Sequence, residues 1–176
     1  MAMHWKPLVV VALATLLVSL APARAEVRHA EAAGFEIGDT LVIDATPAVV
    51  WSRLVKPDDW WSTEHRWFDS GRLSLELRPG GCWCEVGPDE AGAQHMTVGY
   101  LKPDKALTLL GGLGPLQALG LSGALQLTLS AEGEGTRLAW TYVVSGYRAE
   151  GIAFLAAPVD GVLTEQIARL KAAAEA

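Results

Sequence analysis

The chain has 176 residues, 51% of them hydrophobic, and a formal net charge of −6 at pH 7. This acidic balance argues against nucleic acid and anionic lipid as binding partners, because their phosphates would be repelled. The length suits one domain that is large enough to bury a core of its own.

Residues 1–25 have the pattern of a secretory signal peptide. Lys6 is followed by an apolar run over residues 8–21 and by an Ala-x-Ala motif that ends at Ala25. The run is shorter than the roughly 20 residues that a helix needs to cross a membrane. We therefore expect cleavage after Ala25, a periplasmic or secreted location, and no membrane span in the mature chain. Loss of Lys6 and Arg24 takes the formal charge to −8.

The first part of the mature chain predicts a strand followed by a short helix. Residues 26–34 show no clear hydrophobic period, and we expect them to form a flexible lead-in. Alternating apolar residues from Phe35 onward predict the strand. Thr46 and Pro47 predict the start of the helix, with the threonine as N-cap and the proline in the first turn. Pro57 ends this helix.

The rest of the chain predicts a sheet and a long helix. Strand-like segments alternate with turns from Leu73 to Val144, as in an antiparallel sheet. From Ile152 to Leu170 apolar side chains recur every three or four positions, which is typical of an amphipathic helix. Because a one-sided sheet and a one-sided helix must cover each other, we expect an α+β fold. A curved antiparallel sheet of six or seven strands would wrap around the long C-terminal helix.

Five segments of the chain resemble a known superfamily. They are ATPAVVW at 45–51, DDWW at 58–61, PGGCWCE at 79–85, GTRLAWTYVVSGY at 135–147 and VDGVLTEQIARLK at 159–171. Their pattern is similar to that of the START-like (SRPBCC) superfamily, which includes polyketide cyclases, Bet v 1 proteins and Hsp90 ATPase activator-like proteins. The resemblance implies a helix-grip domain over residues 35–176, with a hydrophobic cavity between the sheet and the terminal helix.

The resemblance does not imply a reaction, because members bind lipids, aromatics or polyketides and only some are enzymes. An Hsp90 activator would need its chaperone and ATP in the same compartment. Neither is expected outside the cytoplasm. For an exported chain, the activator-like label would therefore describe shape rather than activity.

Aromatic residues are the main candidates for ligand binding. Trp140 and Tyr142 share the strand face that should meet the terminal helix. Trp60 and Trp61 follow the short helix, where the implied fold places the mouth of the cavity. Pockets are mostly apolar with a few polar groups, so these side chains suit a cavity wall as well as they suit a core.

The segment Cys-Trp-Cys-Glu at residues 82–85 can face the core in two ways. With both cysteines inside, it is ordinary packing. With Trp83 and Glu85 inside, it supplies a pocket wall and a buried carboxylate, and both residues become candidates for ligand binding. Family members that resemble this segment carry an aromatic residue where Trp83 stands, which favours the second arrangement.

The two cysteines invite three interpretations. In an extended strand Cys82 and Cys84 lie on one face about 6.6 Å apart, so a disulfide between them would need a sharp kink. A metal site needs more ligands than two thiolates, and only His95 offers itself. We therefore predict neither a metal site nor a cofactor. A disulfide between two chains stays open, because an oxidising compartment leaves exposed thiols at risk.

Two further features bear on function. Glu85 and His95 are the most plausible acid–base groups, whereas a triad of Ser62 and His65 with an acid lacks any framework such as G-x-S-x-G. The loop Gly111–Gly123 is both glycine-rich and apolar, so it is a gate, a partner surface or simple packing.

The sequence predicts carrier-like binding of a small hydrophobic or aromatic ligand in a cavity between the sheet and the C-terminal helix. One alternative is an enzyme of cyclase or hydrolase type that uses Glu85 and His95. Another is a protein-interaction module that acts through the loop Gly111–Gly123.

Overall fold

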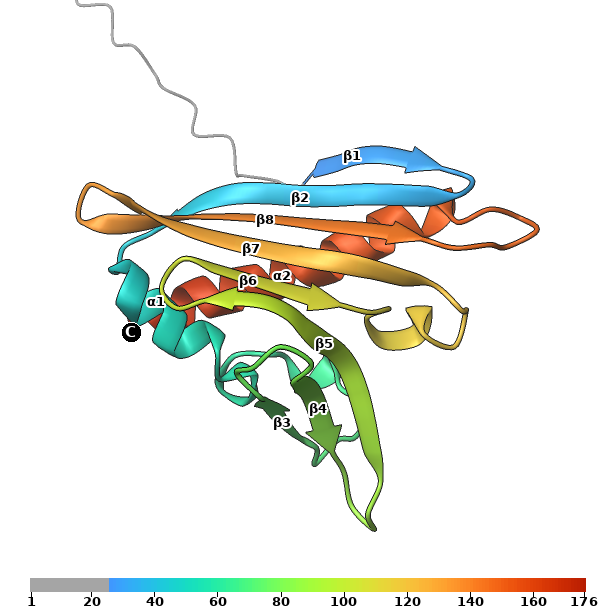
Figure 1. Ribbon diagram of the computed structural model, residues 1–176, viewed down its shortest axis with the longest axis horizontal. Coiled ribbons are helices and arrows are strands. Elements are labelled where there is room, and N and C mark those ends of the chain that lie inside the picture. The colour runs from blue at the N-terminus through green and yellow to red at the C-terminus, as the bar shows by residue number, and fades with distance from the viewer. Residues whose placement is uncertain (1–25) are drawn as a thin grey trace, which may run out of the picture.

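The computed structural model describes residues 26–176, so the expected signal peptide lies outside the described residues. The described part is an α+β domain in which one antiparallel sheet of eight strands is combined with a long C-terminal helix. Figure 1 shows this helix, α2, lying across one face of the sheet, with the shorter helix α1 beside its C-terminal end. In residues 26–176 no helix is both long and apolar enough to cross a membrane.

The sheet is open, and its spatial order is β1-β2-β8-β7-β6-β5-β4-β3. All neighbouring strands are antiparallel. The strands are β1 (Glu26–Glu31), β2 (Gly34–Ile43), β3 (Arg72–Leu75), β4 (Cys82–Val86), β5 (Gly92–Lys102), β6 (Ala106–Leu110), β7 (Ser122–Glu132) and β8 (Gly135–Ser145).

The helices are α1 (Pro47–Leu54) and α2 (Ala156–Glu175). Four 3-10 turns lie in the connections: η1 (Pro57–Asp59), η2 (Thr63–His65), η3 (Gly114–Leu116) and η4 (Ala153–Leu155). The expected start of the short helix is confirmed, because Thr46 is its N-cap and Pro47 its first residue.

The strand count corrects the expectation of six or seven strands. The additional strand is β1, at residues that we expected to be a flexible lead-in. It pairs with β2 through a tight turn, with Glu31 opposite Gly34. Its side chains from Val27 to Glu31 are all exposed. An edge strand that buries neither face has no hydrophobic alternation, which is why its sequence gave no signal.

The core lies between the sheet and α2, as the two hydrophobic periods predict. On β8 every second residue from Leu138 to Val144 is buried. On α2 the buried stripe includes Leu163, Ile167 and Leu170. These two surfaces remove each other from water, and this burial is the main stabilising term of the domain.

Replacing Leu170 tests the contribution of α2 to the core. Leu170 is fully buried, so Leu170→Ala should lower the free energy of unfolding by about 2–5 kcal/mol. Leu110→Ala, at an exposed position of β6, is the matched control and should change it by less than about 0.5 kcal/mol. Urea denaturation followed by circular dichroism measures both. Equal losses in the two variants would contradict this packing.

Candidate functional site

A cavity of about 450 Å³ lies between α2, the loop Gly111–Gly123 and the segment that follows α1. Its walls are mainly apolar and include Trp61, Leu113, Leu116, Leu119, Val159 and Val162. Four polar side chains also line it: Glu64, His65, Arg66 and His95. A mostly apolar wall with a few polar groups is typical of a site for a small organic ligand.

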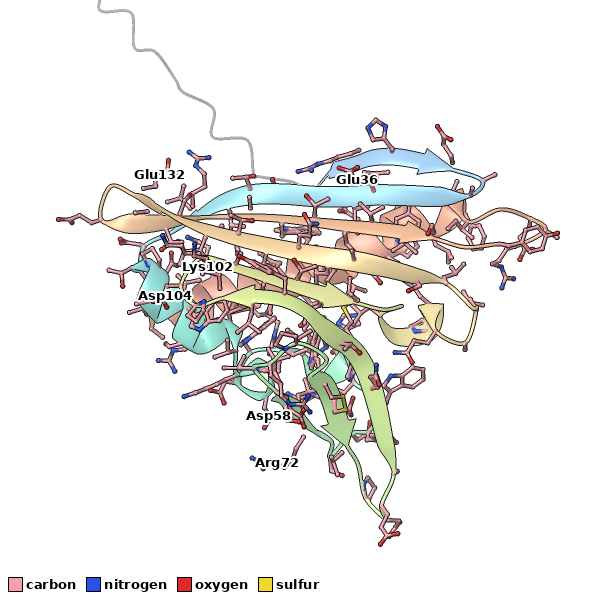
Figure 2. All side chains as sticks on the ribbon, viewed as in Figure 1. Glu36, Asp58, Arg72, Lys102, Asp104 and Glu132 are labelled. Carbon is pink, nitrogen blue, oxygen red and sulfur yellow. A yellow bond between two sulfur atoms is a disulfide. The ribbon has the colours of Figure 1, made fainter. Side chains whose placement is uncertain are left out.

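Asp58 organises the segment that carries the polar side of the cavity. Its Oδ1 accepts hydrogen bonds from Arg66 Nη1 at 2.8 Å and from the backbone N–H of Leu73 at 2.9 Å. Figure 2 shows Asp58 and Arg72 together beside β3, and their charged groups are 3.6 Å apart. The Leu73 hydrogen bond, with help from Arg66, holds the pKa of Asp58 below its usual value against the opposing effect of burial.

A bulge between β4 and β5 brings the two candidate acid–base residues together. Trp83 pairs with Met96 but Cys84 pairs with Gln94, so His95 is an extra residue on β5. His95 and Met96 are consequently both buried, although a regular strand would send them to opposite faces. The bulge thus turns His95 toward the interior, where Glu85 also lies.

Glu85 and His95 form a buried hydrogen-bonded pair. His95 Nε2 lies 2.9 Å from Glu85 Oε2, and both side chains are almost completely buried. The Glu85 oxygens also accept hydrogen bonds from the backbone N–H groups of Trp67 at 3.0 Å and Phe68 at 2.9 Å. These donors supply the hydrogen bonds that a buried carboxylate requires. Gly71 makes room for the carboxylate, because a Cβ at that position would overlap it.

His95 offers a hydrogen-bond acceptor that no described residue uses. Burial lowers the pKa of His95, an effect partly opposed by Glu85 and reinforced by the charge of Arg66. The neutral ring donates its Nε2–H to the Glu85 carboxylate, which leaves a lone pair on Nδ1. Nδ1 is buried and has no hydrogen-bond partner among the described residues.

The structure places the segment Cys-Trp-Cys-Glu with Trp83 and Glu85 inside, the second of the two arrangements considered. Trp83 stacks on His95 with ring centroids 5.4 Å apart, and it meets Trp61 edge to face at 4.8 Å. Trp60 and Trp83 border a second space of only about 20 Å³. Of these tryptophans, Trp61 lines the large cavity.

The disulfide between Cys82 and Cys84 differs from the sequence expectation. The two residues are joined within one strand, and their Cα atoms are 5.3 Å apart. Regular strand geometry would give about 6.6 Å, so β4 is locally contracted where the register with β5 shifts. The expectation assumed a regular strand, and the irregular pairing at this point removes that assumption.

Trp140 and Tyr142 are buried in the core, on the strand face that the sequence predicts to meet the interior, and neither lines the 450 Å³ cavity. The Tyr142 hydroxyl accepts a hydrogen bond from the Leu113 N–H at 3.0 Å and donates one to the Gly111 carbonyl at 2.9 Å. Burial raises the pKa of Tyr142 to about 12. Tyr142 thus acts on the cavity indirectly, by holding the loop that forms one wall.

The loop Gly111–Gly123 packs onto the body of the domain. Leu113, Leu116 and Leu121 are buried, and the first two also line the cavity. Gln117 Nε2 donates to the backbone carbonyl of His95 at 3.1 Å, which ties the loop to β5. The loop is therefore a cavity wall.

The side chains of Ser62 and His65 hydrogen-bond to other groups rather than to each other. Ser62 Oγ accepts from the Glu64 N–H, and His65 Nδ1 lies 3.0 Å from Gln166 Nε2. Gln166 is fully buried and its Oε1 accepts from the Ser62 N–H at 2.7 Å. Sequence reasoning missed Gln166, although a polar residue next to Ile167 on the apolar stripe of a helix is a readable signal.

Over residues 26–176, no three His, Cys, Asp or Glu side chains gather closely enough to hold a metal ion.

Comparisons with known proteins agree on the fold. No family model and no curated protein matches the chain. A protein of unknown function from Staphylococcus aureus matches with a TM-score of 0.60 and 10% identity, over 81% of this chain and 94% of that one. The Aha1 dimer from Colwellia psychrerythraea matches with a TM-score of 0.54 and 19% identity, over 80% of this chain and 96% of that one. A conserved protein of unknown function from Enterococcus faecalis matches with a TM-score of 0.54 and 18% identity, over 81% of this chain and 74% of that one.

At these identities the likeness shows the fold alone. The neighbours fit a helix-grip fold, which agrees with the open sheet and its long C-terminal helix.

The lowered pKa of His95 predicts a pH dependence of stability. The unfolded chain binds a proton at His95 near pH 6.5, where the folded protein does not. The contribution to stability is therefore complete above about pH 6.5 and is lost as the pH falls toward the folded pKa. Below about pH 6.5, and until the folded pKa is reached, the unfolding free energy of the wild type should fall faster than that of His95→Gln, by up to about 1.4 kcal/mol per pH unit.

Urea denaturation at a series of pH values measures this difference. His29→Gln removes an exposed histidine of β1 and should keep the wild-type slope. If the unfolding free energies of the wild type and His95→Gln changed equally with pH, His95 would not be the source of the pH dependence.

Proposed function

We propose that this protein binds a small hydrophobic or aromatic molecule in the cavity beside α2 and acts as a carrier. The observation that carries the proposal is the 450 Å³ cavity itself, with its mainly apolar wall. Such a volume falls within the range of small-molecule sites. An apolar ligand would gain free energy by leaving water, in proportion to the area it buries.

His95 supplies the polar end of the proposed site. Its ring lines the cavity and its Nδ1 has no partner among residues 26–176. A buried acceptor without a donor is costly, so a ligand that donates one hydrogen bond there is favoured over one that does not. The ligand is therefore apolar over most of its surface and carries one N–H or O–H group.

The family resemblance and the export pattern complete the proposal. We assign the chain to the START-like superfamily on the residues that resemble it, supported by the helix-grip fold of its structural neighbours. The pattern of residues 1–25 supports export to the periplasm or beyond. The Aha1 neighbour contributes shape to this argument, and the activator role of related cytoplasmic proteins is not carried over.

Binding of N-phenyl-1-naphthylamine tests the carrier proposal. This probe is neutral and aromatic, has one N–H group, and becomes fluorescent in apolar surroundings. We expect one molecule to bind per chain. The analogue 1-benzylnaphthalene replaces the N–H by a CH₂ group, so it should compete roughly 3- to 10-fold more weakly, the equivalent of one neutral hydrogen bond.

Two variants place the probe in the molecule. Val162→Trp fills the cavity from α2 and should abolish binding. Val143→Trp adds the same bulk at an exposed position of β8 and should leave binding unchanged. If both variants bound the probe like the wild type, the cavity would not be the site.

The Glu85–His95 hydrogen bond favours a second candidate, an acid–base enzyme of hydrolase or cyclase type. A carboxylate that holds the Nε2–H of a histidine leaves Nδ1 free to accept a proton. In ester hydrolysis Nδ1 would take a proton from water, the water oxygen would attack the acyl carbon, and the alcohol would leave with a proton.

Hydrolysis of 4-nitrophenyl acetate, with N-phenyl-1-naphthylamine as the competitor, tests this candidate. If the pair is catalytic, Glu85→Gln should lower the competitor-sensitive rate by about 100-fold or more while affinity for the competitor changes little. Glu76→Gln, an exposed carboxylate next to β3, is the control and should keep the rate. If the competitor does not reduce the wild-type rate, hydrolysis does not take place in the cavity. The enzyme candidate is then wrong, and the carrier function is the one that remains.

The third possibility, a protein-interaction module through the loop Gly111–Gly123, gains no support from the structure. The apolar side chains of Leu113, Leu116 and Leu121 are buried and so offer little surface to a partner.

A further inference from the structure

The disulfide between Cys82 and Cys84 lies next to the proposed binding site. These are the two cysteines of the chain, and their bond spans a single residue, Trp83. Trp83 touches the cavity wall through Trp61 and His95. The residue that follows the disulfide is Glu85, the hydrogen-bond partner of His95.

This disulfide contributes little to holding the fold together. A cross-link stabilises a protein mainly by closing a loop in the unfolded chain, and its effect grows with the length of that loop. Here the loop comprises only residues 82–84. The domain has a continuous hydrophobic core between the sheet and α2, so we expect the fold to persist when the bond is reduced.

The bond is also open to attack. Side chains alternate along β4, with Trp83 and Glu85 buried on the inner face and Cys82 and Cys84 half-buried on the outer face. A thiol reagent can therefore approach the sulfur atoms from outside the domain, without entering the core or the cavity. Access of this kind is typical of labile disulfides, whereas structural ones are usually shielded.

The bond shortens the strand at the place where the site is built. The Cα atoms of the two cysteines are 5.3 Å apart, about 1.3 Å less than in a regular strand. The register of β4 against β5 shifts between Trp83 and Cys84. Because of this shift, His95 has no pairing partner on β4. Release of the cross-link would let β4 extend and would move Trp83 and Glu85 relative to His95.

We propose that Cys82–Cys84 is a thiol–disulfide exchange site for a dithiol, and that its redox state sets the affinity of the adjoining cavity. The second half of this statement rests on the proposed ligand-binding function. The oxidised form presents the site as the structure shows it. In the reduced form the stacking of Trp83 on His95 and the Glu85–His95 hydrogen bond are both weakened.

The exchange needs only the dithiol as co-reactant. One thiolate of the dithiol attacks a sulfur of the disulfide, the Sγ–Sγ bond breaks, and the departing sulfur takes a proton. The second thiol of the reagent then attacks the mixed disulfide and releases the other cysteine. Two electrons and two protons pass to Cys82 and Cys84, and the reagent becomes a cyclic disulfide.

Reduction of the native protein with dithiothreitol, followed by iodoacetamide, tests the exchange site. We expect two carbamidomethyl groups per chain by mass spectrometry without denaturant, and an unchanged far-ultraviolet circular dichroism spectrum. A bond that is reduced only in denaturant would overturn the exchange site. Loss of the far-ultraviolet signal on reduction would show that the disulfide is structural and would overturn the proposal as well.

Two readouts then test the coupling to the cavity. The near-ultraviolet circular dichroism of the stacked aromatic cluster should change on reduction. Affinity for N-phenyl-1-naphthylamine should fall roughly 3- to 10-fold, the equivalent of one weakened hydrogen bond. The variant Cys82→Ser/Cys84→Ser should match the reduced protein and should not respond to dithiothreitol. Reoxidation of the wild type should restore both signals.

The readouts also separate this inference from the proposed function. If the probe binds neither redox form, the carrier function is wrong, and the near-ultraviolet signal alone decides the coupling. If the probe binds both forms equally and the near-ultraviolet signal does not change, the coupling is wrong and the carrier function stands.

Discussion

A carboxylate buried in an apolar domain persists only when hydrogen-bond donors surround it, and Glu85 meets this condition with three N–H groups. Two belong to the backbone of Trp67 and Phe68, in the segment after α1, and the third belongs to His95 on β5. One side chain thus holds together two parts of the chain that regular secondary structure does not join. The closeness of Gly71 to the carboxylate shows how little freedom the arrangement has.

The same principle recurs at the other walls of the cavity. Tyr142, on β8, bonds the backbone of the loop Gly111–Gly123. Gln166, on α2, bonds the backbone N–H of Ser62. In each case a polar side chain on an otherwise apolar face fastens an irregular segment to a rigid element. Three such attachments surround one cavity, which explains how segments without hydrogen-bonded ladders can form a defined wall.

The long elements could be predicted from the sequence because each buries one face. Hydrophobic alternation along β8 and the three-to-four spacing along α2 both report that burial directly. The edge strand β1 buries neither face, so its sequence carries no period. Trp83 and Glu85 are two residues apart on one strand and therefore share a face. Their common inward orientation could be anticipated for this reason.

Other parts of the site follow from geometry that the sequence pattern does not contain. The bulge that turns His95 inward depends on the pairing of two strands. The donors to Glu85 are backbone groups, which every residue possesses. The Cys82–Cys84 disulfide was expected to be disfavoured because regular strand dimensions were assumed, and β4 departs from them at this point. The hydrophobic pattern of a segment therefore predicts which of its faces is buried. It does not predict bulges or contractions, which depend on how strands pair.

The attachment of the loop by Tyr142 has an evolutionary consequence. The hydrogen bonds of the tyrosine hydroxyl join it to backbone atoms of Gly111 and Leu113, so this anchor does not depend on which side chains the loop carries. Substitutions at Leu113 or Leu119 would reshape the cavity while the loop stayed attached. A lineage could therefore change its ligand by drift in this loop, with the sheet and α2 unaltered.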